Sequence, residues 1–400
     1  MKVLFNAFSA CRLRTGVGCY AKNLFQELRR LAGEEVRPFP TGWLAAATRM
    51  TGSILTRHSG GVPIASHESP RSIAKLRQKL GGLVRTSGRK LSERGLRRAS
   101  RRDQYDLYHE PNFIPWRCDL PAIATVHDLS AILHPEWHPP ERARFHQRHF
   151  ERGLENCAHV IADSDCVRRE LIRHFRIAPQ RVDAIHLGVG DEFRPMNYVE
   201  VAPVLARLNV PISYLLYVGT IEPRKNLLTL LRAYCDLPNS VRASSPLVLA
   251  GSWGWNFEEV RSYYESTARD RGVLHVGYVA DADLPALYNG ARALVYPSFY
   301  EGFGLPPIEM MACGGPVLAS TAATLREVCG RQAHFLDPED LAGWRNALRQ
   351  IIEDDDWHAE LSAGVVEHSR RFSWQNCAEH TLKLYRRLVN HEPIALPAAA

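Results

Sequence analysis

Two series of short apolar segments, each alternating with amphipathic segments, run along this chain of 400 residues. Apolar runs such as "KVLFNAF" and "SYLLYVG" are typical of buried strands, and "GVGCYAKNLFQELRRLA" has the apolar spacing of a helix. A polar, proline-bearing segment, "EFRPMNYVEVAP", divides the two series and is interpreted as a linker. The pattern predicts two α/β domains with parallel sheets. Ligands of such sheets bind at the carboxyl ends of the strands, so the cleft between the domains is the expected site.

Residues 296–320, "YPSFYEGFGLPPIEMMACGGPVLAS", place two carboxylates around a glycine turn. The predicted strand "ALVYPS" leads into this segment and puts Glu301 at the carboxyl edge of the second sheet. Gly302 and Gly304 let the backbone approach a ligand closely, and two prolines begin a helix with Glu309 near its start. Amides at a helix start attract phosphate, and carboxylates accept hydrogen bonds from vicinal hydroxyls. The segment therefore predicts a site for a phosphate together with a ribose or a hexose.

A pair of cations occurs in "GTIEPRKN", residues 219–226, directly after the strand "YLLYV". Arg224 and Lys225 stand at a predicted loop–helix junction, where they could clamp a diphosphate, arginine by its bidentate fork and lysine as a point charge. The start of a helix disfavours cations, which argues against a merely solvated pair. A clamp of this kind would stabilise a departing nucleoside diphosphate.

The glycines of "GVGCYA", residues 16–21, also fit the dinucleotide fingerprint G-x-G-x-x-A. This motif supports a rival function, an NAD-dependent oxidoreductase. In that fingerprint the first glycine follows the strand almost directly, whereas several residues separate "KVLFNAF" from Gly16. No clear second strand ending in an acid follows about 20 residues on. The rival is therefore kept as an alternative only.

Histidine and aspartate patterns give one candidate residue at the cleft and no metal site. His127 ends the strand "AIATV", at the carboxyl edge of the first sheet and facing the cleft. "DSD", residues 163–165, resembles a metal-binding D-x-D, but a helix cap by Ser164 or Asp165 explains it better. A further group of histidines has no carboxylate or cysteine to complete a zinc site and is interrupted by prolines: His134, His138, His146 and His149.

Charge is concentrated in residues 71–102, which hold twelve Lys or Arg and one acid, while the whole chain has a net charge of +7. Interleaved aliphatic residues make this segment amphipathic in parts, which suits an anionic membrane surface. It lacks aromatic residues for base stacking, so nucleic acid is not an expected partner. No run of about 18 apolar residues is present, and nine scattered cysteines without C-x-x-C spacing indicate a reducing cytosol.

"EGFGLPPIE" resembles the E-x7-E signature of retaining glycosyltransferases of family 4, which have the GT-B fold. The resemblance extends over nearly the whole chain. "YVGTIEPRKNLLTLLRAY" is similar to the phosphate-binding segment of the family, and "HVGYVADADLPALYNGARALVYPS" to the segment that leads to the signature. "TVHDLSAILHPEWHPPERARFHQRHF" and "IADSDCVRRELIRHF" resemble the amino-terminal domain, and "TGVGCYAKNL" resembles the glycine loop that faces the donor phosphates.

The resemblance implies three parts: an acceptor-binding domain over residues 1–200, a nucleotide-sugar domain over 201–375, and a helix over 376–392 that crosses back to the first domain. It implies transfer of a hexosyl group to a lipid-linked glycan or polysaccharide. Mannosyl from GDP-mannose is the best guess for the donor, with dTDP- or GDP-linked deoxyhexoses close behind. Synthesis of O-antigen, capsule or exopolysaccharide by a cytoplasmic enzyme, peripheral at the inner face of the membrane, would follow. A non-catalytic nucleotide-sugar-binding protein on the same fold stays a further alternative.

The same resemblance implies roles for individual residues and neither a metal nor another cofactor. Glu309 would hold the ribose, while Glu301 and three neighbouring amides would hold sugar and phosphate. His127 would contact the transferred sugar. The implied catalytic residues are Glu301, His127, Arg224 and Lys225. The implied donor-binding residues are Gly16, Gly18, Gly219, Arg224, Lys225, Tyr278, Val279, Glu301, Phe303, Gly304, Leu305 and Glu309.

Overall fold

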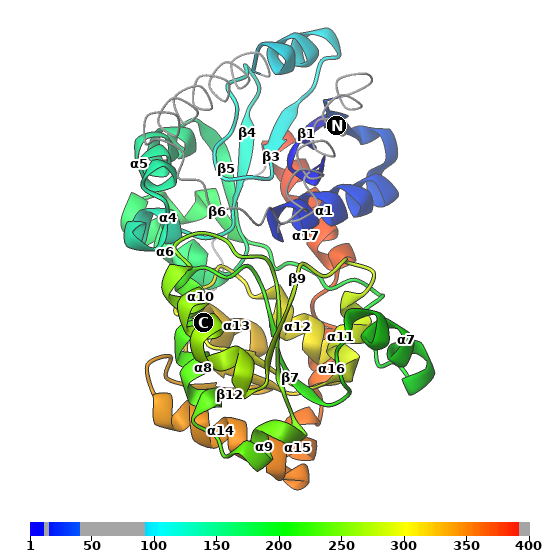
Figure 1. The fold of residues 1–400 in the computed structure, drawn as a ribbon. Coiled ribbons are helices and arrows are strands. Elements are labelled where there is room, and N and C mark those ends of the chain that lie inside the picture. The colour runs from blue at the N-terminus through cyan, green and yellow to red at the C-terminus, as the bar shows by residue number, and fades with distance from the viewer. Residues whose placement is uncertain (12–15, 41–92, 392–400) are drawn as a thin grey trace.

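Two six-stranded parallel sheets form the framework of the computed structural model, which describes residues 1–11, 16–40 and 93–391 (Figure 1). The strand order of the first sheet is β2-β1-β3-β4-β5-β6. Its central strands are buried over their whole length, which is why they read as uninterrupted apolar runs. The strands are β1 (Val3–Asn6), β2 (Val36–Phe39), β3 (Leu107–Glu110), β4 (Ala122–Val126), β5 (Cys157–Ala162) and β6 (Val182–Ala184).

Helices on the first sheet follow the amphipathic segments. Ser164 caps the amino end of α6 by accepting a hydrogen bond from the Val167 amide at 3.2 Å, which settles the choice between Ser164 and Asp165. The helices are α1 (Gly16–Ala32), α4 (Ser130–Leu133), α5 (Pro140–Glu155) and α6 (Asp165–Phe175).

The second sheet has the order β12-β11-β10-β7-β8-β9. Its strands are β7 (Tyr214–Val218), β8 (Leu247–Ala250), β9 (Val273–Gly277), β10 (Ala291–Tyr296), β11 (Val317–Ser320) and β12 (His334–Leu336). The helices of this half are α7 (Tyr198–Leu208), α8 (Leu227–Cys235), α9 (Asn239–Ser244), α10 (Glu258–Tyr263), α11 (Leu284–Gly290), α12 (Leu305–Ala312), α13 (Ala323–Cys329), α14 (Leu341–Glu353), α15 (Asp355–Ser362) and α16 (Val365–Ser369).

The last helix, α17 (Trp374–Val389), leaves the second half and packs beside α1 of the first, as the red and blue ribbons show (Figure 1). Its Tyr385 hydroxyl lies 2.5 Å from Nδ1 of His109 on β3, and both side chains are completely buried. The ring of Trp374 lies 6.2 Å from that of Tyr20 on α1. The expectation of a carboxyl-terminal helix that crosses back is thus confirmed.

One local prediction was wrong, and two edge strands were missed. Half of the expected linker is helix α7, because Asn197 and Glu200 form a capping box that starts a helix despite Pro203 inside it. Residues 258–271 are helical throughout, as α10 followed by a π-helical turn and a 3₁₀ turn. The edge strands β2 and β12 were not expected, since each is only three or four residues long.

The basic segment lies largely outside the described residues, which include only 93–102 of it. These residues are helical and pack Leu96 into the interior, while all five of their arginines are exposed. Arg101 pairs with Asp119 at 2.7 Å on the surface. No helix of the described residues is long and apolar enough to cross a membrane.

Candidate active site

A cavity of about 780 Å³ lies between the two halves, at the carboxyl ends of strands from both sheets. The amino-terminal half contributes residues that follow β1, β3, β4 and β5, and the carboxyl-terminal half contributes residues that follow β7 and β10. Predicted site residues that line it are Gly16, His127, Gly219, Arg224, Lys225, Glu301, Phe303, Gly304 and Leu305. The strand–helix pattern predicted a site of this kind.

At the centre of the carboxyl-terminal wall, Glu301 is held by both cations of the 219–226 segment. Its Oε2 accepts a hydrogen bond from Arg224 at 2.7 Å, and its Oε1 accepts one from Lys225 Nζ at 2.6 Å. Arg224 also pairs with Glu222 at 2.6 Å, and Lys225 donates to the Tyr296 hydroxyl at 2.9 Å. Arg224 and Lys225 occupy a 3₁₀ turn, Pro223–Lys225, just before α8. Residues 76 positions apart in the sequence thus form one charged cluster.

Burial and opposite charge act against one another in this cluster. Burial disfavours the ionised form of Glu301, but the charges of Lys225 and Arg224 outweigh it and lower its pKa to about 2. The pKa of Lys225 is lowered by burial and by the charge of Arg224. Burial also opposes the charge of Arg224, yet Glu301 and Glu222 raise its pKa above the ordinary value. The cluster therefore contains two cations at the cavity wall, and in the free protein the neighbouring carboxylates balance their charge.

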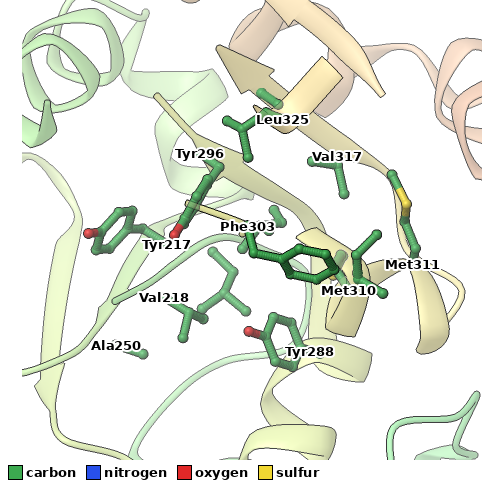
Figure 2. Close-up of a cluster of buried hydrophobic side chains, with 14 of the residues drawn as sticks. Tyr217, Val218, Ala250, Tyr288, Tyr296, Phe303, Met310, Met311, Val317 and Leu325 are labelled. Atoms are coloured by element: carbon green, nitrogen blue, oxygen red, sulfur yellow. The ribbon is translucent and has the colours of Figure 1, made fainter. Parts of the chain in front are cut away.

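The backbone of the signature loop packs tightly against the other half of the molecule. A Cβ atom at Gly302 would lie 1.6 Å from the carbonyl oxygen of His127, so this position excludes any side chain. Gly304 has a φ of 99° and precedes α12, a conformation that favours glycine. Between them, Phe303 belongs to the buried cluster with Tyr288 and Met310 that anchors the loop (Figure 2). The amides of the loop are thereby fixed at the wall of the cavity.

Glu309 is not at the start of its helix, as the sequence suggested, because α12 begins at Leu305. Its Oε2 accepts a hydrogen bond from the Tyr288 hydroxyl at 2.6 Å. Burial, with a contribution from the nearby Glu192 and Asp281, raises its pKa to about 7. Glu309 does not line the cavity that holds Glu301. The two signature carboxylates therefore have opposite electrostatic surroundings.

His127 lies at the cavity, 8% exposed, with both ring nitrogens engaged. Nδ1 is 2.7 Å from Asp163 Oδ2, and Nε2 is 2.9 Å from the Pro111 carbonyl oxygen. Both partners are acceptors, so the ring donates from both nitrogens. Burial disfavours this charged ring, but Asp163 and the Pro111 carbonyl raise its pKa above the ordinary value. To contact a sugar, His127 would have to replace its Nε2 hydrogen bond to the Pro111 carbonyl with one to a sugar hydroxyl.

The glycines of residues 16–21 open α1, and nine residues separate Gly16 from the end of β1. Gly16 lines the cavity, whereas Gly18 is buried within the helix. In a dinucleotide fold the second strand ends in an acid that binds ribose, but β2 ends at Phe39. This arrangement gives the oxidoreductase alternative no support.

Two other predicted donor residues lie apart from the cavity lining. Tyr278 is 44% exposed, and Val279 is buried. The metal alternatives also find no support in the described residues, where no group of three or more His, Cys, Asp or Glu could hold a metal. Asp163 binds His127, and Asp165 pairs with Arg169 on the surface of α6.

The structure adds cavity residues that the sequence did not single out. Asp128 follows His127 at the end of β4, and Glu222 lies within the 219–226 segment. Both residues come after a strand, which is the same signal that pointed to His127 and to the Arg224–Lys225 pair. Trp255 comes from the loop after β8 and gave no sequence signal. Its indole Nε1 donates to the Trp137 carbonyl at 2.9 Å, which joins the two halves beside the cavity.

A second contact between the halves involves Glu327 of α13. Its two carboxylate oxygens accept hydrogen bonds from the amides of Asp165 and Cys166, at 2.7 and 2.8 Å. These amides begin α6, where the positive end of the helix dipole favours a carboxylate. His186 Nε2 lies 2.9 Å from the same group. Burial opposes ionisation, but His186 and the two amides lower the pKa of Glu327 to about 2.

A parallel-sheet domain on each side of a charged cavity, with a helix crossing between them, is the architecture of the GT-B fold. Two solved structures share this fold over nearly the whole chain. Sucrose-phosphate synthase from Thermosynechococcus elongatus matches with a TM-score of 0.70 and 21% identity, covering 98% of this chain and 100% of that one. Anabaena Alr3699/HepE, solved in complex with UDP-glucose, matches with a TM-score of 0.66 and 18% identity, covering 96% and 99%.

Sequence comparison identifies the family. Residues 15–193 match the model of Glycosyltransferase Family 4, and residues 208–371 match that of Glycosyl transferases group 1. The chain is 38% identical over 290 residues to O-antigen chain mannosyltransferase B of Escherichia coli, covering 72% of this chain and 76% of that relative. The chain belongs to glycosyltransferase family 4, and the resemblance of its "EGFGLPPIE" segment to that family is confirmed.

Proposed function

We propose that this glycosyltransferase moves a mannosyl group from GDP-mannose, with retention at the anomeric carbon, to a lipid-linked oligosaccharide or polysaccharide. The product would serve O-antigen, capsule or exopolysaccharide synthesis. The observation that carries the proposal is the buried cluster in which Glu301 holds Arg224 and Lys225 at the cavity wall. The name of the Escherichia coli relative supports the choice of sugar and of pathway, and the UDP-glucose complex of HepE supports a nucleotide-sugar donor.

In this proposal the donor lies along the carboxyl-terminal wall. Arg224 and Lys225 bind its diphosphate, and the amides of 303–305 contribute further donors. Glu301 and His127 bind hydroxyls of the transferred sugar. Glu309 accepts hydrogen bonds from the ribose, which stabilises its ionised form. Tyr278 and Val279 would border the nucleoside, and Gly16 and Gly18 would face the phosphates from the other half.

The acceptor hydroxyl attacks the anomeric carbon from the face that the diphosphate leaves. The bond between that carbon and the phosphate oxygen breaks, a bond to the acceptor oxygen forms, and the proton passes to the departing phosphate oxygen. Arg224 and Lys225 stabilise the negative charge that develops on the diphosphate. Closure of the two domains keeps water away from the reacting carbon.

The acceptor would be presented by a membrane. The exposed arginines of residues 93–102 support docking to an anionic surface at its cytoplasmic face, in line with the charge of residues 71–102 as a whole. This surface belongs to the amino-terminal half, which in our proposal receives the acceptor. Vesicle flotation with and without anionic lipid would test the docking.

A thermal-shift panel with GDP-mannose, GDP, UDP-glucose, dTDP-rhamnose and NAD tests the donor. A ligand at 100 times its Kd stabilises the protein by about 2.7 kcal/mol. We expect a shift with GDP-mannose that the Glu309→Ala variant loses, followed by mannosyl transfer in a radiochemical assay. A Tm shift with another nucleotide-sugar alone would identify that compound as the donor in place of GDP-mannose. A Tm shift with NAD alone would overturn the proposal.

A further inference from the structure

The carboxylate of Asp128 lies at the cavity from the amino-terminal half, beside the signature loop. A Cβ atom at Gly302 would lie 3.0 Å from the Cβ of Asp128, so the two residues are in direct contact across the domain boundary. Arg224 and Arg142 both act on Asp128 electrostatically. Asp128 thus faces the cluster that, in the proposed function, binds the departing diphosphate.

Neighbouring groups hold this carboxylate in one orientation. Its Oδ1 accepts hydrogen bonds from the amide and the hydroxyl of Ser130, at 2.9 and 2.7 Å. Since the Ser130 hydroxyl donates to Asp128, it can accept from His138, whose Nε2 lies 3.0 Å away. Ser130 and His138 are 1% and 3% exposed. The buried side chains of Ser130 and His138 therefore fix Oδ1 of Asp128, and Oδ2 points away from Ser130.

The charge of Asp128 persists at neutral pH. Burial alone would raise its pKa, but Arg224 and the hydrogen bonds from Ser130 lower it below the ordinary value. An ionised carboxylate is an acceptor only, and a sugar hydroxyl is a suitable donor to it. Phe113 and Trp255 line the same cavity and add apolar surface of the kind that packs on a sugar ring.

Retention places strict limits on the acceptor. A hydroxyl that attacks from the side of the leaving group must lie beside the leaving phosphate oxygen, and hence near Arg224. From the amino-terminal half, Asp128 is the described carboxylate that combines the field of Arg224 with contact to the signature loop. We propose that Asp128 binds the acceptor sugar by accepting a hydrogen bond from a hydroxyl next to the one that is glycosylated, with Ser130 and His138 as positioning residues.

This inference rests on the proposed function, and its test separates the two. The probes are GDP-mannose as donor and octyl α-mannopyranoside as acceptor. For the Asp128→Asn variant we expect kcat/KM for the acceptor to fall about 10- to 100-fold, as for loss of a hydrogen bond to a charged group. The Kd for GDP-mannose, measured by calorimetry, should not rise, because the substitution removes a negative charge near Arg224.

Ser130→Ala provides a milder variant that keeps the carboxylate, and we expect kcat/KM for the acceptor to fall about three- to tenfold. Asp119→Asn removes a carboxylate of the same domain from an exposed ion pair, and it should have no effect on either constant. The inference is overturned if Asp128→Asn leaves kcat/KM for the acceptor unchanged, or weakens GDP-mannose binding as much as it slows transfer. Absence of transfer and of donor binding in the wild-type protein would instead overturn the proposed function.

Discussion

Substitution of Glu301 by glutamine should reveal the charge balance of the cavity wall. The wild-type carboxylate accepts bonds at 2.7 and 2.6 Å from Arg224 and Lys225, whose side chains are 15% and 7% exposed. Removing one partner of a buried ion pair costs about 3–5 kcal/mol, because the remaining charge stays buried. For a unit of 150–250 residues, each kcal/mol lowers Tm by about 2–4 °C, so we expect a fall of roughly 6–20 °C.

Without ligand the Glu301→Gln variant should have a lower Tm than the wild type, but its gain in Tm on binding GDP should be larger. A nucleoside diphosphate supplies negative charge to the two released cations, so GDP should raise the Tm of Glu301→Gln by more than it raises that of the wild type. Transfer should be lost, because the sugar hydroxyls lose their acceptor. Differential scanning fluorimetry with and without GDP measures both shifts.

Glu353→Gln is the matched control, since it removes the same group from the exposed ion pair with Arg349. Exposed pairs of this kind contribute about 0.2–1 kcal/mol, so its Tm should hardly move. An unchanged Tm for Glu301→Gln without ligand, or a GDP shift no larger than the wild-type shift, would refute the reasoning.

Three further predictions concern other parts of the site. Because burial raises the pKa of Glu309 from 4.5 to about 7, its ionisation costs stability as pH rises through that range. Glu309→Gln should therefore gain stability relative to the wild type between pH 5 and pH 8; a difference in Tm independent of pH would contradict this. Glu327→Gln loses one of two acceptors for the α6 amides, and we expect a larger radius of gyration by small-angle scattering and a higher KM for the donor; an unchanged radius would count against the contact. Gly302→Ala places a methyl group on the His127 carbonyl, so transfer should fall by at least about tenfold while circular dichroism stays unchanged; full activity would show that the halves separate there during turnover.

The sequence was sufficient to predict the class of fold and the charged wall of the cavity. Fully buried parallel strands produce apolar runs, and those runs indicate where Glu301, Arg224 and Lys225 must lie, because each comes within seven residues of the end of such a run. Position after a strand is local information. It does not depend on how the more distant parts of the chain fold.

The environment of a side chain is not local information. Glu309 was expected near exposed amides, but Tyr288, 21 residues earlier, donates to it within the protein. Trp255 acquires its place from a contact across the domain boundary, which no periodicity encodes. In α7, the capping box outweighed a proline that had suggested a linker.

Packing of α17 against α1 has a consequence for how the chain is made. The His109–Tyr385 contact joins residues 276 positions apart, both fully buried in the amino-terminal half. During synthesis the strands of the first sheet leave the ribosome long before Trp374 and Tyr385 are translated. The amino-terminal half emerges first, but its core can be completed only after α17 has been made. Until then it exposes apolar surface that a chaperone would need to shield.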